Sequence, residues 1–123
     1  MIKLYNKLKT IVESEYKDIV ASTKILGKRT IGSAKLRIFF KDQSYLDIWL
    51  SSSGKYSYHW EQRAQRGIIY RHDNAPDFPH IKTHPQHLHD GNEKSIQPSY
   101  IDTNPAIAIK QVLTVIKQKL EKG

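Results

Sequence analysis

The sequence predicts an α+β fold, in which an antiparallel sheet is flanked by an N-terminal and a C-terminal helix. Three observations support this prediction. An amphipathic stretch covers residues 2–21, apolar and polar residues alternate in the middle of the chain, and a second amphipathic stretch follows Pro105. The 123 residues suit one domain, residues 1–123, that is large enough to bury a core.

The N-terminal helix is predicted from apolar residues that recur every three or four positions, which places them on one helix face. Lysines and glutamates fill much of the opposite face, so this helix is expected to cover one side of a sheet. Ile25 and Leu26, further on, either begin a strand or belong to a connection. The apolar positions of the helix are Leu4, Leu8, Ile11, Val12, Ile19 and Val20.

The strands are predicted where strict alternation of apolar and polar residues begins. Residues 35–41, 45–50 and 56–61 alternate in this way, and short polar turns separate them. After a polar turn over residues 62–67, residues 68–72 complete a sheet of about four strands. Because hairpins need few linking residues, an antiparallel meander is expected.

Regular alternation ends after Asp73, and residues 74–104 are expected to form a long His- and Pro-rich loop before the last helix. Four of the five prolines lie in this segment. Pro105 suits the first turn of the C-terminal helix, with Asn104 or Thr103 as its cap.

The composition limits the classes of function. A net charge of +8 attracts polyanions, which fits an RNA or DNA substrate, an acidic protein partner or simply a lysine-rich surface. The absence of cysteine excludes disulfides, thiolate metal sites and a cysteine nucleophile, and it fits a cytoplasmic location. No apolar run is long enough for a membrane span, and the N-terminus lacks a signal-peptide core. Phosphate-binding-loop and serine-hydrolase motifs are absent as well.

Two segments offer candidate site residues on or beside strands. In residues 56–61, Tyr58 and Trp60 share one face of the strand, and His59 lies on the opposite face. The two aromatic residues either stack on bases or belong to the core. His59 is a candidate for proton transfer, because imidazole titrates near neutral pH.

The second segment begins at the end of the last predicted strand, where rigid scaffolds often present site residues. Arg71 is suited to hold a phosphate. Two interpretations of Asp73 and Asn74 remain open. In the first, Asp73 orients a histidine and Asn74 binds substrate. In the second, both residues simply form the turn.

Four histidines follow within a short segment, and three interpretations remain open. One or two of them transfer protons or contact phosphate; or they bind a divalent cation together with Asp73, Asp77 or Asp90; or they shape the loop through local hydrogen bonds. Their spacing matches no metal motif, so neither a metal nor a cofactor is expected. The four are His80, His84, His87 and His89.

Taken together, three strings of the sequence resemble the TumE family, whose members are toxin components of toxin–antitoxin pairs. They are YSYHW at residues 56–60, YRHDNAP at 70–76 and THPQHLH at 83–89, and the resemblance covers roughly residues 33–118. It implies a small antitoxin as partner. The matching residues are Tyr56, Tyr58, His59, Trp60, Arg71, Asp73, Asn74, Pro76, His87 and His89.

The chain departs from the family pattern at two places. Asp77 and Phe78 stand where a histidine pair commonly follows the DNAP motif, while His84 replaces an aromatic residue and Gln86 replaces a histidine. Family roles at those positions are therefore not carried over.

The leading hypothesis is a toxin that acts on RNA as a metal-independent ribonuclease. His59, His87 and His89 would transfer protons, Asp73 would orient a histidine, and Arg71 would stabilise the charge on the phosphate. The alternatives are a non-enzymatic basic module that binds nucleic acid or an acidic antitoxin, and a divalent-metal nuclease or phosphodiesterase. The expected partners are RNA, a small antitoxin and a second copy of the chain, without a membrane.

Overall fold

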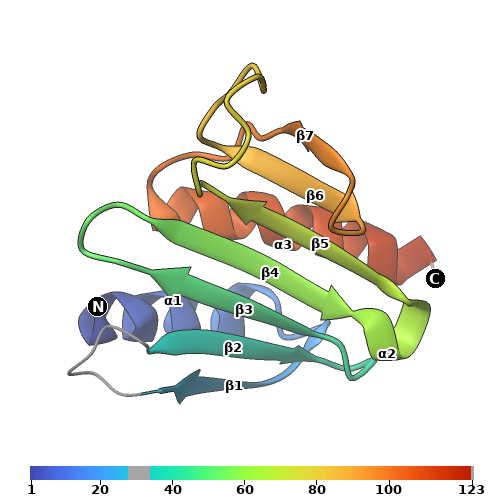
Figure 1. The fold of residues 1–123 in the computed structure, drawn as a ribbon. Helices are drawn as coiled ribbons and strands as arrows, with labels where there is room; N and C mark the ends of the chain where they lie inside the picture. The colour runs from blue at the N-terminus through green and yellow to red at the C-terminus, as the bar shows by residue number, and fades with distance from the viewer. Residues whose placement is uncertain (28–33, 123) are drawn as a thin grey trace.

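The computed structural model describes residues 1–27 and 34–122, and it confirms an α+β fold in which terminal helices flank an antiparallel sheet. Within the described residues this sheet has seven strands in chain order, so the prediction of about four is wrong (Figure 1). The helices are α1 (Ile2–Glu15), α2 (Arg63–Arg66) and α3 (Pro105–Lys122). The strands are β1 (Val20–Leu26), β2 (Lys35–Phe40), β3 (Tyr45–Leu50), β4 (Tyr56–Gln62), β5 (Ile68–Asp73), β6 (His87–Gly91) and β7 (Ile96–Pro98).

The N-terminal helix is shorter than predicted. It ends at Glu15, and Tyr16 leaves the helical conformation with φ −129° and ψ 24°. The chain then enters β1 at Val20, which pairs with Phe40 of β2. The apolar residues at positions 19 and 20 fit the helical spacing only by coincidence, because pairing with β2 determines the local structure there.

The long irregular segment predicted over residues 74–104 contains two further strands. Residues 87–91 pair with β5 as β6, and residues 96–98 pair with β6 as β7. Both strands are short: β6 is supported by hydrogen bonds to the distant β5, whereas β7 forms a hairpin with β6. A further one-turn helix, α2, occupies most of the predicted 62–67 turn and ends at Gly67, whose φ of 71° suits glycine.

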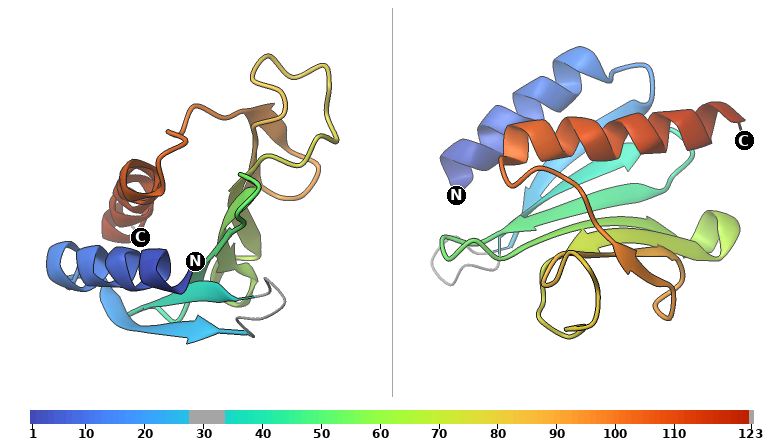
Figure 2. Two further views of the ribbon diagram at one scale, coloured as in Figure 1. Left: turned by 90° about the vertical axis from the view of Figure 1, so that its left-hand side faces the viewer. Right: turned by 90° about the horizontal axis from the view of Figure 1, so that it is seen from above.

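The core lies between the sheet and both terminal helices, which cover the same face of the sheet (Figure 2). Trp60 of β4 is fully buried there, and its indole N–H donates to the Ser44 hydroxyl at 2.9 Å. The rings of Phe40 and Tyr70 meet it edge to face, with centroids 6.3 and 6.4 Å away. Among the described residues, no helix is both long and apolar enough to cross a membrane.

The opposite face of the sheet is mainly polar and is called the polar face below. Successive strand registers place five of its residues in one row, from β2 to β6. Residues 74–86, called the covering loop, lie on this side of the sheet, away from the helices (Figure 2). The row consists of Arg37, Asp47, His59, Arg71 and His89.

One histidine of β5, His72, points to the helix side instead and is 5% exposed. Its Nε2 lies 3.0 Å from the Tyr70 hydroxyl, and its Nδ1 lies 2.7 Å from the Ser99 hydroxyl. Burial lowers the pKa of His72 to about 4, because the charged ring would lose its hydration. His72 is therefore a neutral structural residue at pH 7.

The burial of His72 predicts that the fold loses stability in mild acid. The unfolded chain binds the His72 proton below about pH 6.5, whereas the folded chain does so only near pH 4, so stability falls across this window. The loss is expected to reach about 2 kcal/mol at pH 5. Urea unfolding at pH 7 and pH 5 measures it.

The His72→Gln variant is the control, since it removes this titration from the folded and unfolded states. We expect it to be less stable than the wild type at pH 7 but to lose much less stability on going to pH 5. An equal loss in both proteins would contradict the assignment.

Candidate functional site

The centre of the polar face is a row of three residues on neighbouring strands. Arg71 of β5 pairs in register with His59 of β4 on one side and with His89 of β6 on the other. Because neighbouring strands lie about 4.8 Å apart, two imidazoles flank one guanidinium. His59 Nδ1 lies 3.3 Å from Arg71 Nη1. The structure thus brings together three residues that the sequence scattered over 31 positions.

Arg71 is held by two carboxylates. Its Nε donates to Asp73 at 3.0 Å, and its two terminal nitrogens donate to the Glu93 carboxylate at 2.7 and 2.6 Å. This ion pair lowers the pKa of Glu93 to about 2. Glu93 lies in the turn between β6 and β7, and it could not be identified before that hairpin was known. A phosphate that binds Arg71 from solvent must displace Glu93, whose side chain is 54% exposed.

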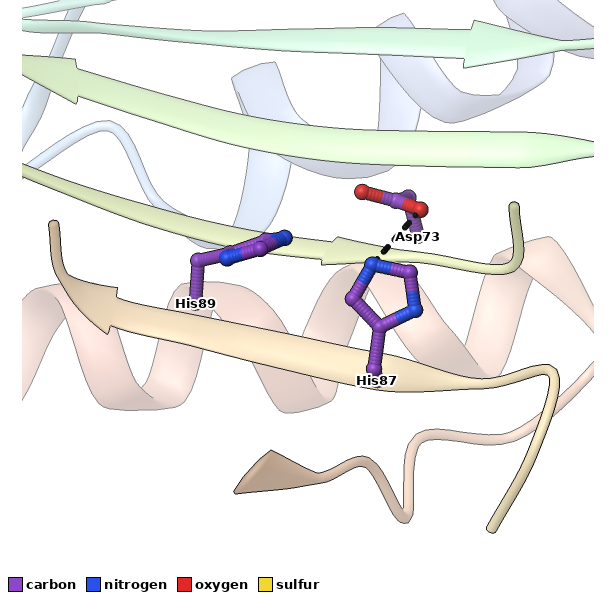
Figure 3. A group of neighbouring side chains, drawn as sticks. All are labelled: Asp73, His87 and His89. Atoms are coloured by element: carbon purple, nitrogen blue, oxygen red, sulfur yellow. Dashed lines mark ion pairs between the residues drawn. The ribbon is translucent and has the colours of Figure 1, made fainter. Parts of the chain in front are cut away.

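Asp73 and His87 form the next register pair on this face of the same two strands. The Nε2 atom of His87 lies 3.0 Å from Asp73 Oδ1, as the dashed line in Figure 3 marks. His87 Nδ1 lies 3.1 Å from the Pro85 carbonyl oxygen. The expected neighbourhood of Asp73 and a histidine is therefore present, although on a strand rather than in a loop.

His87 and His89 are covered from the polar side by Phe78 of the covering loop. The Phe78 ring centroid lies 4.8 Å from that of His87 and 5.8 Å from that of His89. The two histidines are only 2% and 4% exposed. Burial lowers the pKa of His89, and Arg71 and His87 add to this effect, so His89 is neutral at pH 7.

Asp73, His87 and His89 also form a potential metal-binding group. Each offers one ligand atom, and these atoms all lie within 4.8 Å of one another. The three side chains converge between β5 and β6 (Figure 3). The sequence contained these residues, but their spacing did not reveal the group because Asp73 comes from a different strand.

Two other predicted residues do not fit their proposed role, and a third, Asn74, makes structural hydrogen bonds beside the cavity that it lines. Tyr58 and Trp60 are 2% and 0% exposed on the helix side, so no base can stack on them. The Asn74 side chain accepts a hydrogen bond from the Tyr56 N–H and donates one to the Gly54 carbonyl, each at 2.9 Å. Asn74 therefore links the end of β5 to the connection between β3 and β4.

The polar face carries a different tryptophan. Trp49 of β3 lines a cavity of about 240 Å³ that Asp73 also lines, next to the His59–Arg71–His89 row. Strand alternation could have identified it, because Trp49 falls between the core residues Ile48 and Leu50. His80 and His84 lie exposed in the covering loop, outside the row.

These features define an α+β protein with a helix-covered sheet and a site of acid, base and arginine side chains on the other sheet face. A comparison with protein families matches residues 7–120 to the family described as toxin TumE, so the chain belongs to the TumE family. Membership indicates the toxin component of a toxin–antitoxin system and implies an antitoxin partner. No curated protein and no solved structure gives a significant match.

Proposed function

We propose that this toxin cleaves RNA and that the reaction takes place on the polar face. The observation that supports this most strongly is the His59–Arg71–His89 row, in which a guanidinium suited to phosphate lies between two imidazoles. The cavity beside Trp49 adds an aromatic surface on which a base can stack. Trp49 thus takes the role expected earlier of Tyr58 and Trp60.

Cleavage requires two proton transfers around one phosphate. The ribose 2′-oxygen loses its proton and bonds to phosphorus, while the bond to the 5′-oxygen breaks and that oxygen gains a proton. Arg71 binds the phosphate and stabilises the charge that develops on it. His59 is the accessible group for one transfer, with 18% of its side chain exposed and its Nε2 3.1 Å from Glu61.

The other side of the phosphate faces the Asp73–His87–His89 group. These side chains lie beneath Phe78, so the covering loop must move before an RNA atom can reach them. The metal-independent hypothesis requires this group to act as a base on its own. This stays a prediction, and RNA cleavage measured in the presence of a chelator tests it.

Induced expression in a bacterial host tests the proposal in cells. The wild type is expected to arrest growth and fragment RNA, and the His59→Ala variant is expected to do neither. His80→Ala, which removes an exposed histidine of the covering loop, is expected to behave as the wild type. Growth arrest with intact RNA, together with tight salt-dependent RNA binding, would instead favour the non-enzymatic binding module.

Removing the acid that competes for Arg71 should strengthen RNA binding. In Glu93→Gln the bidentate ion pair is lost, so phosphate no longer has to displace a carboxylate. Because exposed ion pairs contribute up to about 1 kcal/mol, affinity is expected to rise about two- to fivefold. Fluorescence anisotropy with a labelled RNA measures this change.

The matched control is Glu13→Gln, which removes one negative charge from an exposed position of α1. Its affinity for RNA is expected to stay within the error of the wild-type value. Equal gains in both variants would show that net charge, and not the release of Arg71, is responsible.

A further inference from the structure

We propose that Asp73, His87 and His89 bind a divalent transition-metal cation such as Zn²⁺ between β5, β6 and Phe78. The proposal concerns binding and goes beyond RNA cleavage: the cation can be detected whether or not the chain cuts RNA. Two imidazoles and one carboxylate are a ligand set that suits Zn²⁺ and related divalent metals.

The distances between the ligand atoms suit a metal after small adjustments. Tetrahedral Zn²⁺ with bonds of about 2.0 Å holds its ligand atoms about 3.3 Å apart. His87 Nε2 and Asp73 Oδ1 are already 3.0 Å apart. The widest separation in the group is at most 4.8 Å, so the remaining contraction is about 1.5 Å, which side-chain rotation can supply.

The hydrogen-bond partners of His87 call for a positive charge at its Nε2, supplied either by a second ring proton or by a bound cation. Both ring nitrogens face acceptors, the Pro85 carbonyl at Nδ1 and the Asp73 carboxylate at Nε2. A neutral imidazole carries one proton and can donate only one of these bonds. A cation at Nε2 resolves this conflict, because Nδ1–H then donates to Pro85, which is the usual arrangement behind a metal-bound histidine.

His89 supplies an independent observation. Its Nδ1 is buried and finds no hydrogen-bond partner among the described residues. A buried nitrogen without a partner costs free energy of folding, so such atoms are rare in native structures. His89 also offers one ring nitrogen to the group, within 4.8 Å of the ligand atoms of Asp73 and His87.

The surroundings favour a bound cation as well. Asp73 Oδ1 also accepts a hydrogen bond from the Ala75 N–H, and Oδ2 accepts one from Arg71, so the carboxylate is oriented from the outside. Phe78 shields the group from water, which strengthens the attraction between a cation and Asp73. Three protein ligands leave a fourth tetrahedral position for water or substrate.

Zinc titration of the full chain tests the proposal. Protein stripped with chelator is titrated with Zn²⁺ in a calorimeter, and its melting temperature is measured with and without the metal. We expect one equivalent to bind with a Kd below about 1 µM and to raise the melting temperature by roughly 5 °C or more.

Two variants identify the ligands. His89→Ala and Asp73→Asn are each expected to bind Zn²⁺ at least tenfold more weakly, whereas His80→Ala is expected to bind as the wild type does. Asp73→Asn preserves the side-chain shape and serves as the second variant should His89→Ala not fold, which circular dichroism shows.

The result that overturns the proposal is equally specific. Stripped wild type that takes up less than about a tenth of an equivalent of Zn²⁺ in this titration would show that His87 and Asp73 form an ordinary ion pair instead. Unchanged affinity in a folded His89→Ala or Asp73→Asn variant would show that zinc binds elsewhere. Loss of RNA cleavage alone decides nothing here, because metal binding is measured directly.

Discussion

Replacing Trp60 with alanine is expected to lower the free energy of unfolding by about 3–5 kcal/mol. The indole is fully buried between sheet and helices, and its N–H donates to Ser44 at 2.9 Å. Its removal leaves a cavity beside Phe40 and Tyr70 and removes one buried hydrogen bond to Ser44. Urea unfolding measures the loss, which is a large share of the roughly 5–15 kcal/mol available to a typical domain.

Trp49→Ala is the matched control on the polar face. It is expected to cost up to about 1 kcal/mol of stability, because Trp49 is only half-buried and lies outside the helix-covered core. RNA affinity is expected to fall by about 1–3 kcal/mol, roughly 5- to 150-fold, because one stacking surface is removed. Equal destabilisation by both substitutions, or unchanged RNA affinity in Trp49→Ala, would contradict the assignment of the two faces.

Replacing Arg71 with alanine is expected to lower the rate of RNA cleavage by about 10²- to 10³-fold, the usual effect of removing a group that stabilises transition-state charge. Arg71 lies between His59 and His89, and it is the one guanidinium among these three residues, so it alone of the three can hold a phosphate by a planar fork. Single-turnover cleavage of a labelled RNA measures the change, and circular dichroism checks the fold.

Arg71→Lys separates charge from geometry. Lysine keeps the positive charge but cannot make the paired hydrogen bonds, so we expect a rate between those of the wild type and Arg71→Ala. A full wild-type rate in Arg71→Ala would show that Arg71 only positions Asp73 and Glu93, and the phosphate-binding role would then be wrong.

The sequence predicted the parts of the fold that carry a strong local pattern. The alternation in β2, β3 and β4 is visible because one face of each strand is apolar and the other is polar. In β6 this signal is inverted: His87 and His89 are buried beneath Phe78, while Leu88 is only half-buried. The buried face of β6 thus carries polar side chains, so alternation could not reveal the strand.

The site was predictable in its residues but not in its geometry. His59, Arg71, Asp73, His87 and His89 were all named as candidates from sequence, because they are charged or titratable residues on a predicted strand, at its end or in the His-rich segment. Their arrangement depends on the β4–β5 and β5–β6 registers, which bring together segments that no local pattern relates. The role of Glu93 follows from that same arrangement and so was missed.

The most direct test of the central claim, that the polar face cleaves RNA, is incubation of purified protein with an end-labelled RNA. The wild type is expected to cut it, and His59→Ala is expected to cut at least about a hundredfold more slowly. Parallel reactions with chelator and with Zn²⁺ show whether cleavage needs a cation. The product ends give a second readout, because attack by the 2′-hydroxyl leaves a cyclic phosphate. Intact RNA under every condition, or equal cleavage by His59→Ala and wild type, would contradict the account.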